Sequence, residues 1–184
     1  TDIKYTLKSD KDKNINFFIN QGKILNLDLK ENSININFIN NKKIIKSKIN
    51  TVGVSNYSEI KVISSFFGLN LSNIKDIELE SDLETSVKLY LDDRFKIIDS
   101  AFSVKGKIND LNLKHEKIKN IKRFFPSYKS KFFLKDVKVN FNHDSDLKLF
   151  GFIKFNNKFE DFSLSGNVGK NFDLTGKISL RDLL

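Results

Sequence analysis

The chain of 184 residues contains no Cys, Met or Trp and a single Pro. Without Cys, neither a disulfide nor a thiolate metal site can form, so the sequence suits a reducing or an oxidising compartment equally well. No run of 18 apolar residues occurs, and no segment can therefore span a bilayer as a helix. The composition, with 39% hydrophobic residues, is that of a folded, strand-rich protein rather than a disordered one.

Catalytic and metal-binding patterns are also lacking. His115 and His143 are the two histidines, and the run His-Asp-Ser-Asp that begins at His143 is typical of a solvated loop. Asp10–Asn14 resembles the start of a calcium loop, but Ile15 and Gln21 stand where such a loop needs Gly and Glu. No nucleophile is paired with a base in a recognisable pattern. We expect neither an enzyme, a metal site nor a cofactor.

The formal net charge is +9. A basic surface can attract nucleic acid, anionic lipid headgroups or acidic proteins. The lysines are scattered between Asp and Glu, which favours a solvated face over a dedicated anion site. Phe102, Phe162 and Phe172 share the apolar side of their strands while lysines lie opposite, which argues against a base-stacking platform. We expect no nucleic-acid partner.

Apolar and polar residues alternate with period two along most of the chain, as in Val87–Leu91, Phe102–Ile108 and Val137–Phe141. Such strands have one apolar and one wet face, which favours antiparallel hairpins over buried parallel strands. We expect strands of roughly 8–10 residues. The expected connections are Gln21–Gly22, Glu31–Asn32, Asn40–Asn41, Asp92–Asp93, Asn156–Asn157 and Gly169–Asn171.

Two segments have helical spacing instead. Tyr57–Phe67 can be capped at its start by Asn56 or Ser58, and Glu116–Phe125 ends at Pro126. Both are predicted to be short connectors packed over an end of a sheet.

A unit of about sixty residues is repeated, because 75–108 aligns without a gap on 135–168. The shift is even, so each strand residue keeps its face. No linker rich in Pro, Gly or Ser separates the copies, which indicates one continuous sheet. The expected units are N-terminal strands over 1–56, a first repeat over 57–114, and over 115–184 a second repeat with the start of a third.

Glycines at Gly106, Gly166, Gly176 and Gly151 fall where an apolar side chain would continue the alternation. Glycine inside a strand often marks a bend, a bulge or a close backbone approach. These positions predict either a strongly curved sheet or a packing adjustment. The apolar strand faces could then close on each other as a sandwich or barrel, or form an open trough covered by lipid tails.

The run Phe102–Leu113, followed by Ile118–Pro126 and new strands, resembles the repeats of AsmA-like proteins of Gram-negative envelopes, which include the TamB and YhdP relatives. Phe162–Leu184 is similar to the start of a further unit. The resemblance implies an all-β fold with two short helices, in which a long, twisted antiparallel sheet curls into an open groove. It also implies a periplasmic segment of a longer protein anchored in the inner membrane by residues outside this chain.

The expected function is that of a segment of a bridge-like carrier, which moves phospholipids between inner and outer membranes with their acyl chains on the apolar groove. The alternative is a structural or adhesive β-domain with a closed core and no ligand. Membrane contact would come from parts of the parent protein outside this segment. The residues expected to line the groove are Val87, Leu89, Phe102, Val104, Ile108, Leu147, Leu149, Ile153, Phe155, Phe162, Leu164, Val168, Leu174 and Ile178.

Overall fold

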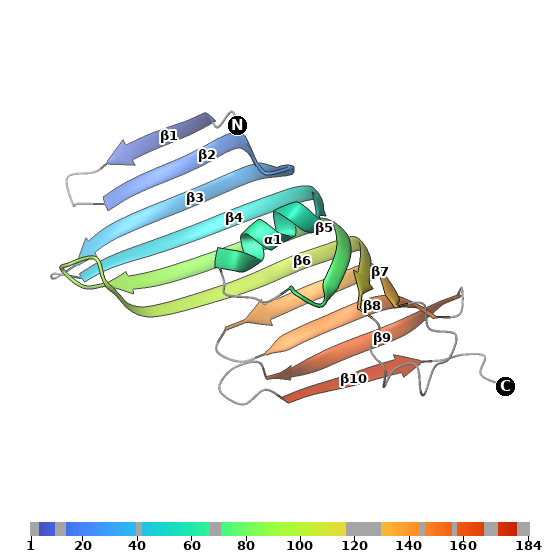
Figure 1. Ribbon diagram of the computed structural model, residues 1–184. Helices are drawn as coiled ribbons and strands as arrows, with labels where there is room; N and C mark the ends of the chain where they lie inside the picture. The colour runs from blue at the N-terminus through green and yellow to red at the C-terminus, as the bar shows by residue number, and fades with distance from the viewer. Residues whose placement is uncertain are drawn as a thin grey trace.

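The computed structural model describes residues 4–9, 14–39, 42–66, 71–116, 130–143, 146–155, 158–167 and 173–179. These residues form ten strands and one helix, and the strands make one antiparallel sheet in chain order (Figure 1). The elements are β1 (Lys4–Ser9), β2 (Asn14–Ile24), β3 (Leu27–Ile39), β4 (Lys42–Asn56), α1 (Tyr57–Phe66), β5 (Ile74–Leu91), β6 (Ile97–His115), β7 (Lys131–Asn142), β8 (Leu147–Phe155), β9 (Lys158–Asn167) and β10 (Asp173–Ser179).

The sheet is open. Within the described residues β1 pairs with β2 alone and β10 with β9 alone, so the two edge strands do not close into a barrel. The strands lie side by side in a single twisted layer, and α1 rests next to β4 and β5 (Figure 1). The predicted all-β class with an open antiparallel sheet is confirmed.

The central strands are longer than predicted, because β4, β5 and β6 have 15, 18 and 19 residues. Two expected turns were wrong. Gln21–Gly22 lies inside β2, and the chain turns at Leu25–Asn26 instead. Glu31–Asn32 lies inside β3, where the β3–β4 register shifts between Leu29 and Ser33 and Glu31 has a φ of 51°. A bulge of this kind interrupts the alternation of apolar and polar residues in the sequence, as a turn also does. Unlike a turn, it leaves the strand continuous.

The expected turn at Asp92–Asp93 is confirmed between β5 and β6, where the backbone N–H of Phe95 donates to the Asp92 carbonyl oxygen at 3.2 Å. The other expected connections, Asn40–Asn41, Asn156–Asn157 and Gly169–Asn171, lie outside the described residues.

Helix α1 begins with a reciprocal cap. The Asn56 side-chain oxygen accepts from the backbone N–H groups of Ser58 and Glu59 at 3.0 and 3.2 Å, and the Glu59 carboxylate accepts from the Asn56 N–H at 2.9 Å. The helix predicted over Tyr57–Phe67 is therefore present over Tyr57–Phe66, with Asn56 as its cap. The helix predicted over Glu116–Phe125 lies, apart from Glu116, outside the described residues.

The two aligned repeats keep their faces but not their strand boundaries. Residues 75–91 lie within the single strand β5, whereas 135–151 include most of β7 and the first half of β8. Val87 and its repeat partner Leu147 nevertheless lie on the same side of the sheet, through the pairings that link β5 to β8.

Two glycines hold neighbouring strands in close contact. At Gly106 the φ is 140° and an added β-carbon would lie 2.2 Å from the Asp82 carbonyl oxygen. At Gly166 the φ is 159° and the nearest atom, the Asp173 carbonyl oxygen, would lie 1.9 Å away. Both positions need glycine, which confirms the predicted close backbone approach. At Gly176 an added β-carbon would meet its nearest neighbour at 3.6 Å, so a close backbone approach does not account for that glycine.

Candidate functional site: the apolar face of the sheet

On one face of the sheet, apolar residues of neighbouring strands lie directly opposite one another and form rows across the strands. In one row Val139 lies opposite Leu149, which lies opposite Leu164 on the next strand. Directly opposite residues of antiparallel strands point to the same side, so this row forms a continuous apolar strip. A second row joins Val87 to Phe102 across β5 and β6.

The predicted groove residues lie together on this side, which we call the apolar face. β5 carries Val87 and Leu89; β6 carries Phe102, Val104 and Ile108; β8 carries Leu147, Leu149 and Ile153; β9 carries Phe162 and Leu164; and β10 carries Leu174 and Ile178. The backbone of Phe155 continues the same register on β8, opposite Lys158. Val168 lies outside the described residues.

The apolar face continues over the first four strands, which the predicted lining did not include. Ile36 lies between Ile15 of β2 and Ile45 of β4, and Ile45 lies opposite Leu89 of β5. The period-two alternation of these strands was visible in the sequence and could have extended the list. The further members are Tyr5, Leu7, Ile15, Phe17, Ile19, Ile34, Ile36, Phe38, Ile45 and Ile49.

Most of the apolar face is only partly covered. Among the described residues the buried apolar side chains are Leu27, Leu29, Leu91 and Val137, each 7% exposed or less. By contrast, Tyr5 and Leu7 on β1 are 62% and 60% exposed and Ile178 on β10 is 52% exposed. A packed sandwich core would bury such side chains, so the described sheet presents a long, open apolar surface.

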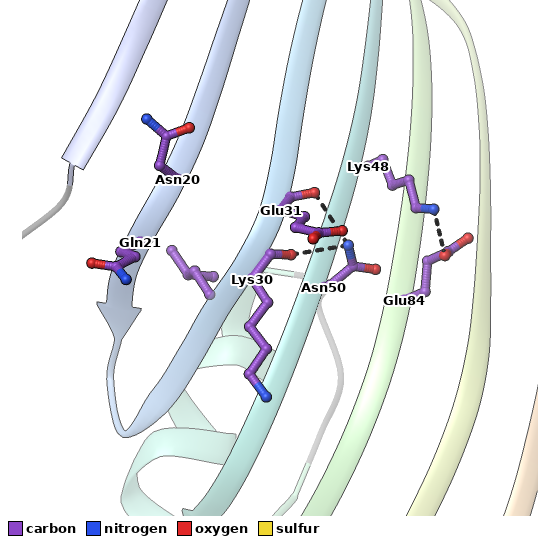
Figure 2. A pocket seen from close by; sticks show the side chains of 8 residues that line it. Asn20, Gln21, Lys30, Glu31, Lys48, Asn50 and Glu84 are labelled. Atoms are coloured by element: carbon purple, nitrogen blue, oxygen red, sulfur yellow. Dashed lines mark hydrogen bonds and ion pairs between the residues drawn. The ribbon is translucent and has the colours of Figure 1, made fainter.

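Small residues lie on the apolar face near α1. Gly53 is opposite Ser81, which is 3% exposed, and Ser55, which is 2% exposed, is opposite Leu79. Figure 2 draws α1 behind the sheet, on the side away from the polar side chains of β3, β4 and β5. Among the described elements, α1 thus covers one end of the apolar face, next to β4 and β5.

Charged side chains gather mainly on the opposite side, which we call the polar face. Lys48 of β4 forms an ion pair with Glu84 of β5 at 2.8 Å, and Lys107 of β6 forms one with Asp136 of β7 at 2.5 Å. The hydrogen bond from Lys107 is the largest influence on the pKa of Asp136 and lowers it. Desolvation opposes this shift, and the charges of Lys107 and Lys135 add to the lowering. The apolar face is therefore backed by a charged, solvated surface.

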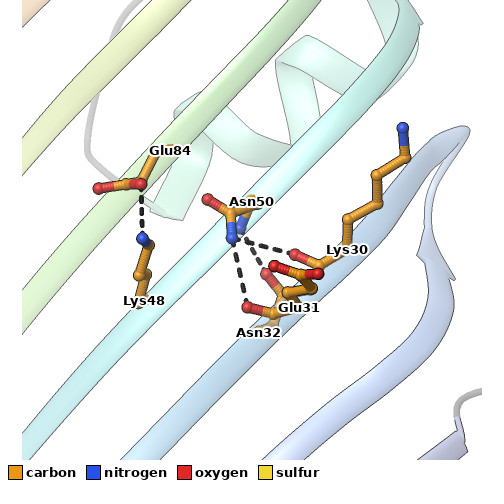
Figure 3. Close-up of polar contacts among 6 residues, drawn as sticks. All are labelled: Lys30, Glu31, Asn32, Lys48, Asn50 and Glu84. Carbon is orange, nitrogen blue, oxygen red and sulfur yellow. Dashed lines mark hydrogen bonds and ion pairs between the residues drawn. The ribbon is translucent and has the colours of Figure 1, made fainter.

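A polar depression of about 580 Å³ lies on the polar face beside the bulge of β3, between β2 and β4 (Figure 2). The Asn50 amide donates to the carbonyl oxygens of Lys30 and Glu31 at 3.0 and 3.3 Å (Figure 3). The backbone N–H of Asn50 donates to the side-chain oxygen of Asn32, which is 1% exposed. These bonds satisfy the backbone groups that the bulge removes from the ladder, so the depression has a structural explanation.

The histidines are not brought together. His143, directly after β7, lies with its ring 4.7 Å from that of Phe102 on β6, while His115, the last residue of β6, has its ring 5.3 Å from that of Phe132 and is 5% exposed. Thirteen residues of extended chain separate Phe102 from His115, which is roughly 43 Å at ~3.3 Å per residue. Within the described ranges no cluster of three His, Cys, Asp or Glu side chains could hold a metal ion, and no helix could cross a membrane.

Comparison with known proteins gives no relative from which a function could be transferred. No protein-family model matches the chain, and neither a curated protein nor a solved structure matches it.

Proposed function

We propose that this chain is a segment of a bridge-like phospholipid carrier whose apolar face holds acyl chains. The observation that supports the proposal is the open apolar face itself, which runs through all ten described strands while most charges lie on the other side. An extended apolar surface that no second layer covers marks a binding surface.

Hydrophobic burial favours a lipid there. A chain of about 15 methylenes gains roughly 12 kcal/mol on leaving water completely, at ~0.8 kcal/mol per methylene, and a face that covers one side of the chain supplies part of this gain. The ten described strands span roughly 43 Å across the sheet at ~4.8 Å per strand, which exceeds the length of one acyl chain. Lipids could therefore follow one another across the strands, with their headgroups in water.

The route between inner and outer membranes, the periplasmic location and an inner-membrane anchor outside this segment are parts of the same proposal. They follow from the resemblance of Phe102–Leu113 and the segments after it to AsmA-like repeats. The acyl-chain surface, by contrast, is argued from the sheet alone and can be tested separately.

Site-specific photocrosslinking tests the acyl-chain surface. Leu164 and Ser165 are neighbours on β9, and their side chains point to opposite faces of the sheet. A photoreactive residue at position 164, or at Leu89 on β5, should crosslink phospholipid in cells, whereas the same residue at position 165 should not. Equal crosslinking at positions 164 and 165, or none at 164 and 89, would contradict the proposal.

A charged replacement on each face provides a second test of the acyl-chain surface. Leu164→Asp should reduce phospholipid capture, while Ser165→Asp, which adds the same charge on the other face, should leave it unchanged. Circular dichroism must show that both variants keep their strand content. Native mass spectrometry of the purified chain separates the carrier from a structural or adhesive β-domain, because co-purified phospholipid is expected only of the carrier.

A further inference from the structure

The polar face of β7, β8 and β9 carries exposed phenylalanines among its lysines. Phe150 lies opposite Lys138, and Phe152 lies opposite Lys135. Each pair shares one side of the sheet, and this side is opposite to that of Leu149. Phe150 and Phe152 are 56% and 39% exposed, so large apolar side chains face water on the charged side.

The next strand extends this cluster. Phe159 of β9 lies opposite Lys154 of β8 and is 47% exposed. The Lys154 ammonium is 5.8 Å from the centre of the Phe159 ring and 5.7 Å from that of Phe133 on β7, within the range of cation–π contacts. We call this cluster the aromatic–basic patch, which consists of Lys135, Lys138, Phe150, Phe152, Lys154 and Phe159. Asp161 lies opposite Phe152 on the same side, so three lysines outweigh one carboxylate there.

Strand β8 is apolar on both sides along the run Leu149–Ile153. Leu149 and Ile153 contribute to the apolar face, and Phe150 and Phe152 to the patch. A continuous apolar run is typical of a strand that is covered on both faces. In the described part of the protein neither side of β8 is covered by a second layer, so the patch has the character of a contact surface.

We propose that the aromatic–basic patch docks onto the surface of an anionic phospholipid bilayer. The Phe150 and Phe152 rings would enter the boundary between headgroups and acyl chains, and the lysine ammonium groups would contact lipid phosphates. This docking goes beyond the acyl-chain surface, since it uses the other face of the sheet.

Charge and ring geometry favour this occupant over two others. If the patch paired with the same patch of a second copy, its lysines would gather in one interface, which is repulsive. Single-stranded nucleic acid requires open ring faces on which bases can stack, and the Lys154 ammonium lies over two of the rings on this side, those of Phe133 and Phe159. Each cross-strand pair of a lysine and a phenylalanine, by contrast, presents an ammonium group and an apolar ring side by side. A bilayer interface offers a matching partner to each, because phosphates lie next to the acyl chains there.

The lack of tryptophan permits a direct test. Phe152→Trp introduces a single indole, whose emission should shift to the blue with vesicles of equal phosphatidylcholine and phosphatidylglycerol and not with phosphatidylcholine alone. High salt should abolish the shift, because screening shortens the reach of the lysine charges. Tyr90→Trp, on the polar face of β5, is the matched control and should show no shift.

Lysine variants test whether the positive charge of the patch contributes to vesicle binding. Lys135→Gln with Lys138→Gln should weaken vesicle binding about fivefold per lysine. The matched pair Lys46→Gln with Lys48→Gln, on the polar face of β4, should leave binding unchanged, and circular dichroism should show all variants folded. Wild-type binding by the Lys135/Lys138 variant, or no blue shift of Phe152→Trp with anionic vesicles, would overturn the docking proposal.

Two further readouts complete the test. Leu164→Asp should retain vesicle docking while it loses acyl-chain capture, because it changes the apolar face alone. The two proposals can therefore fail separately. A blue shift or quenching of Phe152→Trp by oligothymidine that competes with the vesicles would overturn the membrane assignment in favour of nucleic acid.

Discussion

Gly106 of β6 lies against the backbone of Asp82 of β5, so that a β-carbon at Gly106 would come within 2.2 Å of the Asp82 carbonyl oxygen. The Gly106 φ of 140° is also unfavourable for any residue with a side chain. This pair joins the two longest strands near the middle of the sheet, where the local backbone shape sets the path of the apolar face.

Gly106→Ala should therefore destabilise the protein by about 1–3 kcal/mol, because the backbone must shift or remain strained. Gly176→Ala is the matched control, since the nearest atom to an added β-carbon there is 3.6 Å away. We expect that control to stay within about 0.5 kcal/mol of wild type. Urea unfolding measures both, and equal midpoints for the two variants would contradict the close contact at Gly106.

The Asn32 side chain replaces a backbone acceptor in the bulge of β3. Its oxygen accepts the Asn50 N–H, and its buried amide nitrogen has no hydrogen-bond partner in the structure. Asn32→Ala should cost about 1–3 kcal/mol, because the Asn50 N–H loses its partner. Asn35→Ala, which removes a 2.6 Å side-chain bond to Asn16, should cost less because these groups can reach water. Urea unfolding that ranks Asn35→Ala as the more harmful change would refute this role.

The alternation in the sequence correctly identified the apolar side of β5 to β10. The faces of Val87, Phe102 and Leu164 follow from the alternation of side chains along a strand. This alternation holds wherever the strand is regular, and the strands are regular over long stretches. Bulges were harder to recognise, because Gln21–Gly22 and Glu31–Asn32 have the composition of turns. Whether such residues end a strand depends on pairing with distant segments, which a local pattern does not contain.

The aromatic–basic patch was missed for a related reason. The aromatic residues considered, Phe102 and Phe162, do lie on the apolar face. The run Leu149–Ile153 held the missing signal, since a strand that is apolar at consecutive positions must place some of those residues on the polar side. Phe150 and Phe152 are the residues that it places there.

The Lys107–Asp136 ion pair should make stability depend on pH in the acid range. The hydrogen bond from Lys107 lowers the pKa of Asp136 below its ordinary value of 3.8 in the folded state. The stabilisation is therefore present above pH 3.8 and is lost as the pH falls through the folded-state pKa.

Nuclear magnetic resonance titration of the Asp136 carboxyl carbon tests this relation. Lys107→Met should raise the pKa of Asp136 towards 3.8, and Lys135→Met should raise it less, since that residue contributes only its charge. Lys105→Met, on the same face of β6, is the control and should leave the pKa nearly unchanged. An unchanged Asp136 midpoint in Lys107→Met would show that the ion pair is absent in solution.

The Asn56 cap should stabilise the start of α1 and its cover over one end of the apolar face. Asn56→Ala removes the acceptor of the Ser58 and Glu59 N–H groups and should cost about 1 kcal/mol. Ser65→Ala, which removes a bond to the Val62 carbonyl oxygen inside the exposed part of the helix, should have little effect. Amide hydrogen exchange should show faster exchange in α1 for Asn56→Ala, and equal protection in the two variants would argue against the cap.

The open apolar face should bind a hydrophobic dye while the protein is fully folded. Such dyes usually report loosely packed states, but here half-buried side chains such as Val87 and Phe102 form the surface of a regular sheet. Fluorescence of the dye should therefore coexist with a single cooperative urea transition, and added phospholipid should displace the dye. Val87→Thr with Phe102→Ser should lower dye binding, whereas Lys88→Ala with Ala101→Ser, the adjacent cross-strand pair on the polar face, should not. Dye binding that appears only in the unfolding transition would mean that the apolar face is covered in solution, and the acyl-chain surface would then have no place to form.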